Sequence, residues 1–271
     1  MKVNDHIKDK IFFSIVIPTY NRASLITRTV ISLLEQEYQN FEVIIVDDGS
    51  TDDTEAVVKN IDTLKVSYHK IKNSERGFAR NFGAKLAKGD YINFFDSDDL
   101  ALPNHLAIAN KTILEKNFPE LFHLNYRVMK SNSGLVKSNI GKALLANGVL
   151  INGNILSCNG VFLKKEIALQ FPFNESRKLS VSEDWDLWLR LSARYKIHLV
   201  AVVTSYIVDH EERSVMTFNE QKLLDRMKEL LESIGGDAVF VNAFPSAVSK
   251  IKAHMLSYMA LHAILTKHKS I

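Results

Sequence analysis

The stretch IFFSIVIPTYN, residues 11–21, is an apolar run that ends in a polar loop, and it decides the fold. Further apolar runs of strand length follow at residues 41–46, 66–71 and 91–95. Between them, residues 26–34 carry apolar side chains at the spacing of one helix face, and residues 53–60 and 78–87 allow shorter helices. This alternation is typical of strand–helix–strand units. The sequence therefore predicts an α/β fold with a mostly parallel sheet flanked by helices.

Beyond residue 100 the alternation weakens. We expect a helix after Pro103, a strand at residues 121–129, loops and short elements at 130–159, a helix at 182–195 and a strand at 198–203. The last part of the chain has a purely helical pattern, with helices expected at residues 221–234 and 245–267. We therefore expect a C-terminal helical appendage to follow the α/β domain from residue 216.

The composition excludes several kinds of protein. The formal net charge of +3 arises from 34 basic and 31 acidic residues, without the basic run expected for binding nucleic acid. Cys158 is the only cysteine, which excludes an intramolecular disulfide and a thiolate zinc site. No stretch reaches about 18 consecutive apolar residues, and residues 1–11 lack the apolar core of a signal peptide. We expect a cytoplasmic protein without a nucleic-acid partner, with peripheral contact at the inner face of the membrane as an alternative.

Three polar loops follow the first, second and fourth apolar runs: PTYN at residues 18–21, DDGS at 47–50 and DSDD at 96–99. The carboxyl ends of parallel strands meet at one sheet edge, where ligands bind in open α/β sheets. Asp and Ser at such positions also form turns and helix N-caps, which is the alternative for each residue alone. Several carboxylates converging without a cation would repel one another. Carboxylates without a Cys or His cluster suit Mg²⁺ or Mn²⁺, so the loops predict a divalent metal site.

The usual glycine motifs that hold phosphates are missing. No Gly-x-x-x-x-Gly-Lys-Ser/Thr loop and no Gly-x-Gly-x-x-Gly pattern follows the first apolar run. A bound nucleotide would then be held by the metal and by side chains. This argues against a P-loop kinase and against an ordinary dinucleotide-dependent dehydrogenase.

Five motifs, in order, resemble the signatures of the family 2 glycosyltransferases. They are SIVIPTYN at residues 14–21, VDDGSTDDT at 46–54, GFARNFG at 77–83, GDYINFFDSDD at 89–99 and EDW at 183–185. The resemblance covers roughly residues 12–215, and five ordered motifs are far more specific than one. It implies a GT-A fold with a mixed sheet, and transfer of a sugar from a nucleotide donor with inversion at the anomeric carbon.

The resemblance also implies roles for individual residues. Those expected to bind the nucleotide are Pro18, Tyr20, Asn21, Asp47, Asp48, Arg80, Asp96 and Ser97. The metal is expected on Asp98 or Asp99, with His210 reaching the metal or the diphosphate. A surface histidine without a metal role is the alternative for His210.

An inverting transfer needs a carboxylate base opposite the departing diphosphate. Asp184 is the expected base, with Glu183 as its helper. The alternative is that both residues only complement the N-terminus of the helix expected at residues 182–195, where acidic side chains are favoured. Both roles can hold at once.

These expectations combine into one functional hypothesis. Residues 1–215 would form the catalytic domain, with the nucleotide part at about 12–100 and the acceptor side at about 101–215. The substrates would be a UDP-sugar and a hydroxyl of a glycan or lipid-linked acceptor, with Mn²⁺ or Mg²⁺ as cofactor. The alternatives are a nucleotidyltransferase acting on sugar phosphates and a non-catalytic member that only binds a sugar nucleotide.

The role of residues 216–271 is left open by the sequence. These helices could cover the catalytic core, form a homo-oligomer contact or rest on a membrane, because Lys267, His268 and Lys269 end an amphipathic stretch.

Overall fold

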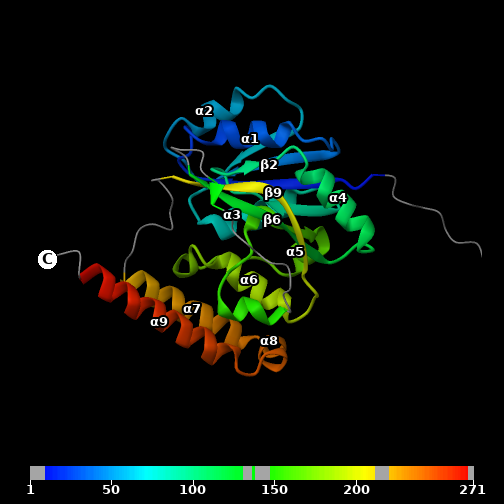
Figure 1. The fold of residues 1–271 in the computed structure, drawn as a ribbon. Coiled ribbons are helices and arrows are strands. Elements are labelled where there is room, and N and C mark those ends of the chain that lie inside the picture. The colour runs from blue at the N-terminus through cyan, green and yellow to red at the C-terminus, as the bar shows by residue number, and fades with distance from the viewer. Residues whose placement is uncertain (1–9, 131–135, 138–146, 211–219, 268–271) are drawn as a thin grey trace, which may run out of the picture.

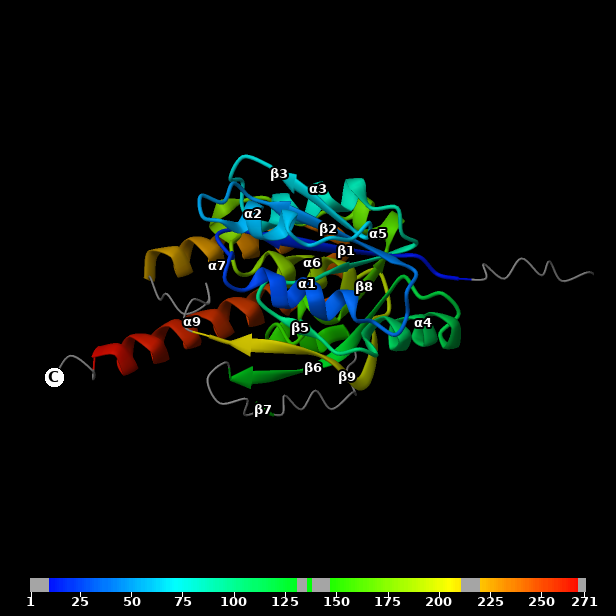
Figure 2. The same cartoon turned by 90° about the horizontal axis from the view of Figure 1, so that it is seen from above.

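The structure is a computed structural model that describes residues 10–130, 136–137, 147–210 and 220–267. One mixed sheet, with strand order β3-β2-β1-β4-β8-β6-β9-β5 and β7 paired to β6, runs through the molecule. Helices cover both of its faces (Figures 1 and 2). The α/β fold class expected from the sequence is confirmed.

The N-terminal half of the sheet is parallel. It consists of β1 (Phe13–Thr19), β2 (Phe41–Asp47), β3 (Val66–Lys70) and β4 (Tyr91–Phe94). β1 lies between β2 and β4, and β2 also pairs with β3. The connecting helices are α1 (Ile26–Leu34), α2 (Thr54–Lys59) and α3 (Arg76–Leu86). These elements lie within one or two residues of the expected ones.

The C-terminal half of the sheet is mixed. β8 (Val161–Lys164) runs antiparallel to β4 and to β6 (Leu121–Lys130), and β6 runs parallel to β9 (His198–Asp209). The short strands β5 (Leu100–Ala101) and β7 (Val136–Lys137) pair with β9 and β6. β9 continues past the strand expected at residues 198–203, and it follows β6 past a register shift near Asn125. This extension brings Val208 close to the end of β4.

Two apolar clusters cover the two faces of the sheet. Strand β1 is buried on both faces: Val16 belongs to one cluster, and Phe13, Ile15 and Ile17 belong to the other. This double burial is what continuous apolar strands predict for a parallel sheet. The first face is covered by α1, α2 and α4 (His105–Glu115). The second is covered by α3, α5 (Lys165–Gln170), α6 (Glu183–Ser192) and the C-terminal helices.

Residues 147–182 consist mainly of loops and short elements, as expected for their first part. They include three 3₁₀ turns, η1 (Asn147–Asn152), η2 (Cys158–Gly160) and η3 (Arg177–Leu179). η2 leads directly into β8, and η3 precedes α6. These turns therefore lie at the carboxyl side of the sheet, next to the polar loops.

The C-terminal helices share the core of the α/β part. α7 (Glu220–Gly236), α8 (Ala238–Ala243) and α9 (Ala247–Lys267) lie below α6 in Figure 1, and α7 and α9 pack on each other. Met227, Leu230 and Ile251 are buried in the same cluster as Trp188 of α6. α8 was not expected from the sequence. It starts at Asp237, whose carboxylate accepts from Val239 N and Phe240 N.

An ion pair ties the end of α6 to this region, because Arg194 Nη1 lies 2.8 Å from Asp237 Oδ2. The described part of the C-terminal appendage, α7 to α9, therefore packs on the core of the α/β part. The expected boundary at 215/216 and the residues His268 and Lys269 lie outside the described residues. No helix in the described part of the chain has the length and apolar character needed to span a membrane.

The shared core predicts that the C-terminal helices unfold together with the sheet. Leu230 is fully buried, so Leu230→Ala should lower the free energy of unfolding by about 2–5 kcal/mol. Urea denaturation followed by tryptophan fluorescence and by circular dichroism should give one coincident transition. Lys228→Ala, on the exposed side of α7, should change stability by less than about 0.5 kcal/mol. Two separate transitions would show that residues 216–271 form an independent unit.

Candidate functional site

A cleft of about 680 Å³ opens at the carboxyl edge of the parallel strands. The loops after β1, β2 and β4 form one wall, and the N-terminus of α3, η3 and α7 form the other. The residues that line it are Pro18, Thr19, Tyr20, Arg22, Asp48, Asn73, Glu75, Arg76, Arg80, Asp96, Ser97, Asp98, Arg177, Lys178, Ser180, Val181, Lys222, Asp225 and Arg226. Six of the eight residues expected to bind a nucleotide are among them.

The loop after β1 presents an aromatic ring to the cleft. Tyr20 is 47% exposed although it follows a fully buried strand. Asn21 does not line the cleft. It adopts a left-handed backbone conformation with φ of 50°, its backbone N donates to Ser50 Oγ at 2.8 Å and its Oδ1 accepts from Thr51 N at 2.8 Å. Asn21 therefore fixes the β1 loop to the β2 loop.

The two adjacent aspartates after β2 differ in their surroundings. Asp47 is buried, and its carboxylate accepts from Ser50 N at 2.7 Å and from the Tyr68 hydroxyl. Asp48 lines the cleft and accepts from Ser74 N at 2.6 Å and from Glu75 N at 2.9 Å. Burial raises the pKa of Asp48, and these backbone donors oppose the shift. Asp47 thus shapes the loop, whereas Asp48 faces the space where a ligand would lie.

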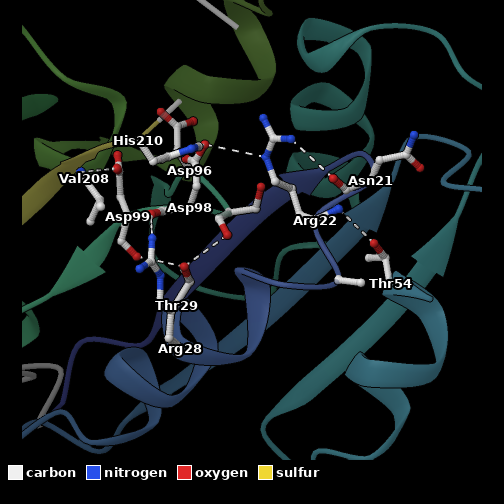
Figure 3. Close-up of polar contacts among 12 residues, drawn as sticks. Asn21, Arg22, Arg28, Thr29, Thr54, Asp96, Asp98, Asp99, Val208 and His210 are labelled. Atoms are coloured by element: carbon white, nitrogen blue, oxygen red, sulfur yellow. Dashed lines mark hydrogen bonds and ion pairs between the residues drawn. The ribbon is translucent and has the colours of Figure 1, made fainter. Parts of the chain in front are cut away.

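The tetrad at residues 96–99 divides its side chains between the cleft and the core. Asp96 and Asp98 point toward the cleft, and Asp98 Oδ2 lies 3.0 Å from His210 Nε2 and 3.6 Å from Arg22 Nε (Figure 3). Ser97 also lines the cleft, and its carbonyl oxygen accepts from Thr29 Oγ1 at 3.1 Å. Two of the expected metal ligands, Asp98 after β4 and His210 after β9, are therefore in contact.

Asp99 is turned into the protein. Its Oδ1 accepts from Val208 N at 2.8 Å, and its Oδ2 accepts from Asn159 Nδ2 at 2.6 Å. Burial, together with the charges of Asp96 and Asp98, raises the pKa of Asp99 well above its usual range. Asp99 thus connects β4 to β9 and η2, and it does not line the cleft.

The donor set around Asp98 fits a hard divalent cation. No group of three or more His, Cys, Asp or Glu side chains within the described ranges is arranged as a complete metal cage. Mg²⁺ and ions like it are commonly bound through one or two carboxylates, with phosphate oxygens and water completing the shell. Asp98, His210 and the neighbouring Asp96 provide a partial set of this kind on an open cleft.

Arg80 links the tetrad to α6. It is 2% exposed, its Nη2 lies 2.8 Å from Asp96 Oδ1, and its Nη1 lies 2.6 Å from Glu183 Oε1. The ring of Phe173 lies under the guanidinium, at 5.2 Å from ring centroid to Arg80 Cζ. Glu183 thus contacts Arg80, while its own carboxylate is buried and does not line the cleft.

Asp184 is the second residue of α6 and follows Glu183 of this ion pair. Its Oδ2 accepts from Asn154 Nδ2 at 2.9 Å and its Oδ1 accepts from Trp185 N at 2.7 Å. Burial, with the charge of Glu183, raises the pKa of Asp184 to about 7, and Arg80 opposes the shift. A carboxylate with this pKa can accept a proton near neutral pH. Its position in the first turn of α6 agrees with the helix-terminus role as well.

Several cleft residues were missed by the sequence analysis. Arg22 contacts Asp98 and follows Asn21 directly, so the loop motif could have included it. Lys222 and Arg226 reach the cleft from α7, on which they lie four residues apart. That spacing places both on one helix face, but the sequence does not show that this face packs over the cleft.

The different roles of Asp98 and Asp99 predict different effects on stability. Asp99→Ala should lower the free energy of unfolding by about 1–3 kcal/mol, because Val208 N and Asn159 Nδ2 lose their buried acceptor. Asp98→Ala should change it by less than about 1 kcal/mol, because Asp98 lines the open cleft, where water can replace the lost carboxylate. Urea denaturation of both variants without metal measures this difference. Equal losses would contradict the assignment of Asp99 to the core.

Comparisons with known proteins agree on one family. The family model described as glycosyl transferase family 2 matches residues 14–118. The UDP-Glc:alpha-D-GlcNAc-diphosphoundecaprenol beta-1,3-glucosyltransferase WfaP of Escherichia coli is 33% identical over 258 residues, covering 90% of this chain and 96% of that protein. A glycosyltransferase of Rickettsia bellii (strain RML369-C), named as uncharacterized, is 32% identical over 191 residues. That match covers 67% of this chain but 26% of the Rickettsia protein, so this chain spans only part of the length of such relatives.

The solved structures show the same fold. S. aureus TarS in complex with UDP-GlcNAc superposes with a TM-score of 0.70 at 24% identity, covering 91% of this chain and 72% of that one. Mannosyltransferase PcManGT from Pyrobaculum calidifontis, in complex with GDP-Man and Mn²⁺, gives a TM-score of 0.60 at 18% identity and covers 96% of this chain and 80% of that one. Sequence motifs, family model and architecture therefore agree: the chain belongs to the family 2 glycosyltransferases and has the GT-A fold.

Proposed function

We propose that this protein transfers the sugar of a UDP-sugar, with inversion, to a hydroxyl of a glycan or lipid-linked acceptor. One observation carries the proposal: Asp96, at the acidic edge of the cleft, is joined through the buried Arg80 to Glu183, the residue next to Asp184. The proposed donor site and a carboxylate of raised pKa are thus connected through one guanidinium and its partner. Membership of the family and the name of the Escherichia coli relative WfaP support a UDP-sugar and a lipid-linked acceptor.

The nucleoside would occupy the β1 and β2 side of the cleft. Tyr20 offers an exposed ring against which a base can stack, and Pro18 extends that apolar surface. Asp48 can accept from the base, because its Oδ1 has a second acceptor position besides the one used by Ser74 N, whereas Oδ2 accepts from both Glu75 N and Asn73 Nδ2. Asn21 and Asp47 would keep these residues in place.

Asp96 and Ser97 would meet the ribose. Arg80 lines the cleft beside them and would provide positive charge toward the diphosphate. Asp98 and His210 would hold Mn²⁺ or Mg²⁺, and Asp99 would support them from the core. Such a metal neutralises the charge that develops on the departing diphosphate.

Asp184 would be the base. Its carboxylate would take the proton of the acceptor hydroxyl while the hydroxyl oxygen bonds to the anomeric carbon and the bond to the diphosphate breaks. Asn154 would orient Asp184 by donating to Oδ2, while Oδ1 accepts from Trp185 N. Glu183 would help by holding Arg80. Peripheral contact with a membrane and oligomer formation through residues 216–271 stay predictions.

The donor proposal predicts ligand-dependent stabilisation. In a thermal-shift screen of UDP-, GDP- and dTDP-sugars with Mn²⁺, a UDP-sugar should raise the melting temperature most, because it binds the folded state. EDTA should remove most of the shift, and Asp98→Asn should weaken it. A larger shift with a GDP-sugar would overturn the choice of base. Release of pyrophosphate in place of UDP would indicate a nucleotidyltransferase.

The role of Asp184 predicts a pH profile. Below the pKa of about 7 the carboxyl is protonated and cannot accept a proton. Therefore kcat/KM should fall about tenfold per pH unit under acidic conditions and level off above pH 7. Asp184→Asn should transfer sugar about 10²–10⁴-fold more slowly, with UDP binding unchanged, while Asp53→Asn in an exposed loop serves as control. Equal activity of Asp184→Asn and the parent would assign the base to another residue.

A further inference from the structure

The wall of the cleft opposite the β1 loop carries more positive charge than its carboxylates balance. Arg80 contacts both Asp96 and Glu183, and Arg76 Nε lies 3.8 Å from the same Glu183 oxygen. Arg226 of α7 is close enough to Glu183 and Arg76 for electrostatic interaction. Three guanidinium groups therefore lie near the one carboxylate of Glu183, and that of Arg80 also pairs with Asp96 of the proposed donor site.

Of these three arginines, Arg226 has the fewest contacts with carboxylates. Its Nε is buried without a hydrogen-bond partner, and it forms no ion pair with another described residue. Burial lowers the pKa of Arg226, Arg76 adds to the shift, and Glu183 opposes it. A structural arginine would be expected to have a paired, hydrogen-bonded guanidinium, since burying an unpaired charge is costly. Arg226 instead lines an open cleft.

Further cations extend this surface. Lys222 lies one turn before Arg226 on α7, and Lys178 of η3 lines the same wall. Asp225 is the acidic residue that α7 contributes to the cleft. Arg177 also lines the cleft, and it pairs with Glu75 Oε1 at 3.1 Å and donates to Asn73 O at 2.7 Å. The surface made by Arg76, Lys222 and Arg226 is therefore suited to an anion.

This surface and the proposed metal ligands belong to different parts of the cleft. Asp98 and His210 follow β4 and β9, whereas Arg226 of α7 has Glu183 and Arg76 as electrostatic neighbours. Glu183 is adjacent to Asp184 at the start of α6. A group bound by Arg226 would thus lie on the side of the proposed base, where the acceptor must enter.

We propose that Arg76, Lys222 and Arg226 form a second anion site, which binds a phosphate or diphosphate group carried by the acceptor. The proposal rests on the proposed function in taking Asp184 as the base. Guanidinium groups suit phosphate oxygens because they donate two parallel hydrogen bonds. The C-terminal helices would then select acceptors by charge, in addition to completing the core.

The test uses the full chain and inorganic pyrophosphate in metal-free buffer, with affinity measured by isothermal titration calorimetry. Without metal, Asp96 and Asp98 disfavour an anion at the donor edge, so pyrophosphate should report on the second site. Arg226→Gln should weaken pyrophosphate binding at least tenfold, and Arg226→Lys, which keeps the charge, should weaken it less. Lys228→Gln removes a charge from the exposed side of the same helix and should change the affinity less than twofold.

A second titration, of UDP with Mg²⁺, separates this site from the donor site. UDP affinity should change less than threefold in Arg226→Gln. An equal loss of UDP and pyrophosphate binding would assign Arg226 to the donor diphosphate and overturn the proposal, as would unchanged pyrophosphate binding in Arg226→Gln. If UDP fails to bind the parent protein, the proposed function fails, while the pyrophosphate titration still decides whether the anion site exists. Melting temperatures of all variants verify that they are folded.

Discussion

Arg80 is buried, and its guanidinium joins two parts of the site that are distant in the chain. Through it, Asp96 at the end of β4 is connected to Glu183 at the start of α6, with N–O distances of 2.8 Å and 2.6 Å. Removing one partner of such a buried pair leaves an uncompensated charge, which typically costs about 3–5 kcal/mol. Arg80 Nε and Glu183 Oε2 have no hydrogen-bond partner of their own. The contact between Arg80 Nη1 and Glu183 Oε1 is therefore what pairs these two side chains, and it connects α6 to α3.

The same guanidinium sets the protonation behaviour around it. Burial and the charge of Glu183 raise the pKa of Asp184, whereas Arg80 lowers it. Without Arg80, two adjacent carboxylates at the start of α6 would repel each other more strongly. With Arg80 present, Glu183 is paired and the pKa of Asp184 is about 7. One buried cation thus places neighbouring acidic residues in different surroundings, which is how acid and base roles are commonly separated in active sites.

The sequence predicted the parts of the site that depend on local pattern. Loops after parallel strands must meet at one edge, so Tyr20, Asp48, Asp96 and Asp98 could be placed together from strand order alone. It could not predict which carboxylates turn inward, because that depends on donors from distant segments. Asp99 is held by Val208 and Asn159, and both contacts exist only because β9 extends beyond its expected end and η2 precedes β8.

The packing of the C-terminal helices could not be predicted from the sequence either. Their apolar periodicity predicted helices, but it could not show that α7 packs against η3 and α6 with Lys222 and Arg226 toward the cleft. Because Leu230 and Met227 on α7 are buried in the core that also contains Trp188, the position of Arg226 is fixed by packing and not by a flexible loop. A cation carried on a packed helix has less conformational entropy to lose on binding an anion than one carried on a mobile loop. In the proposed anion site, α7 would therefore discriminate between acceptors without a change in its own position.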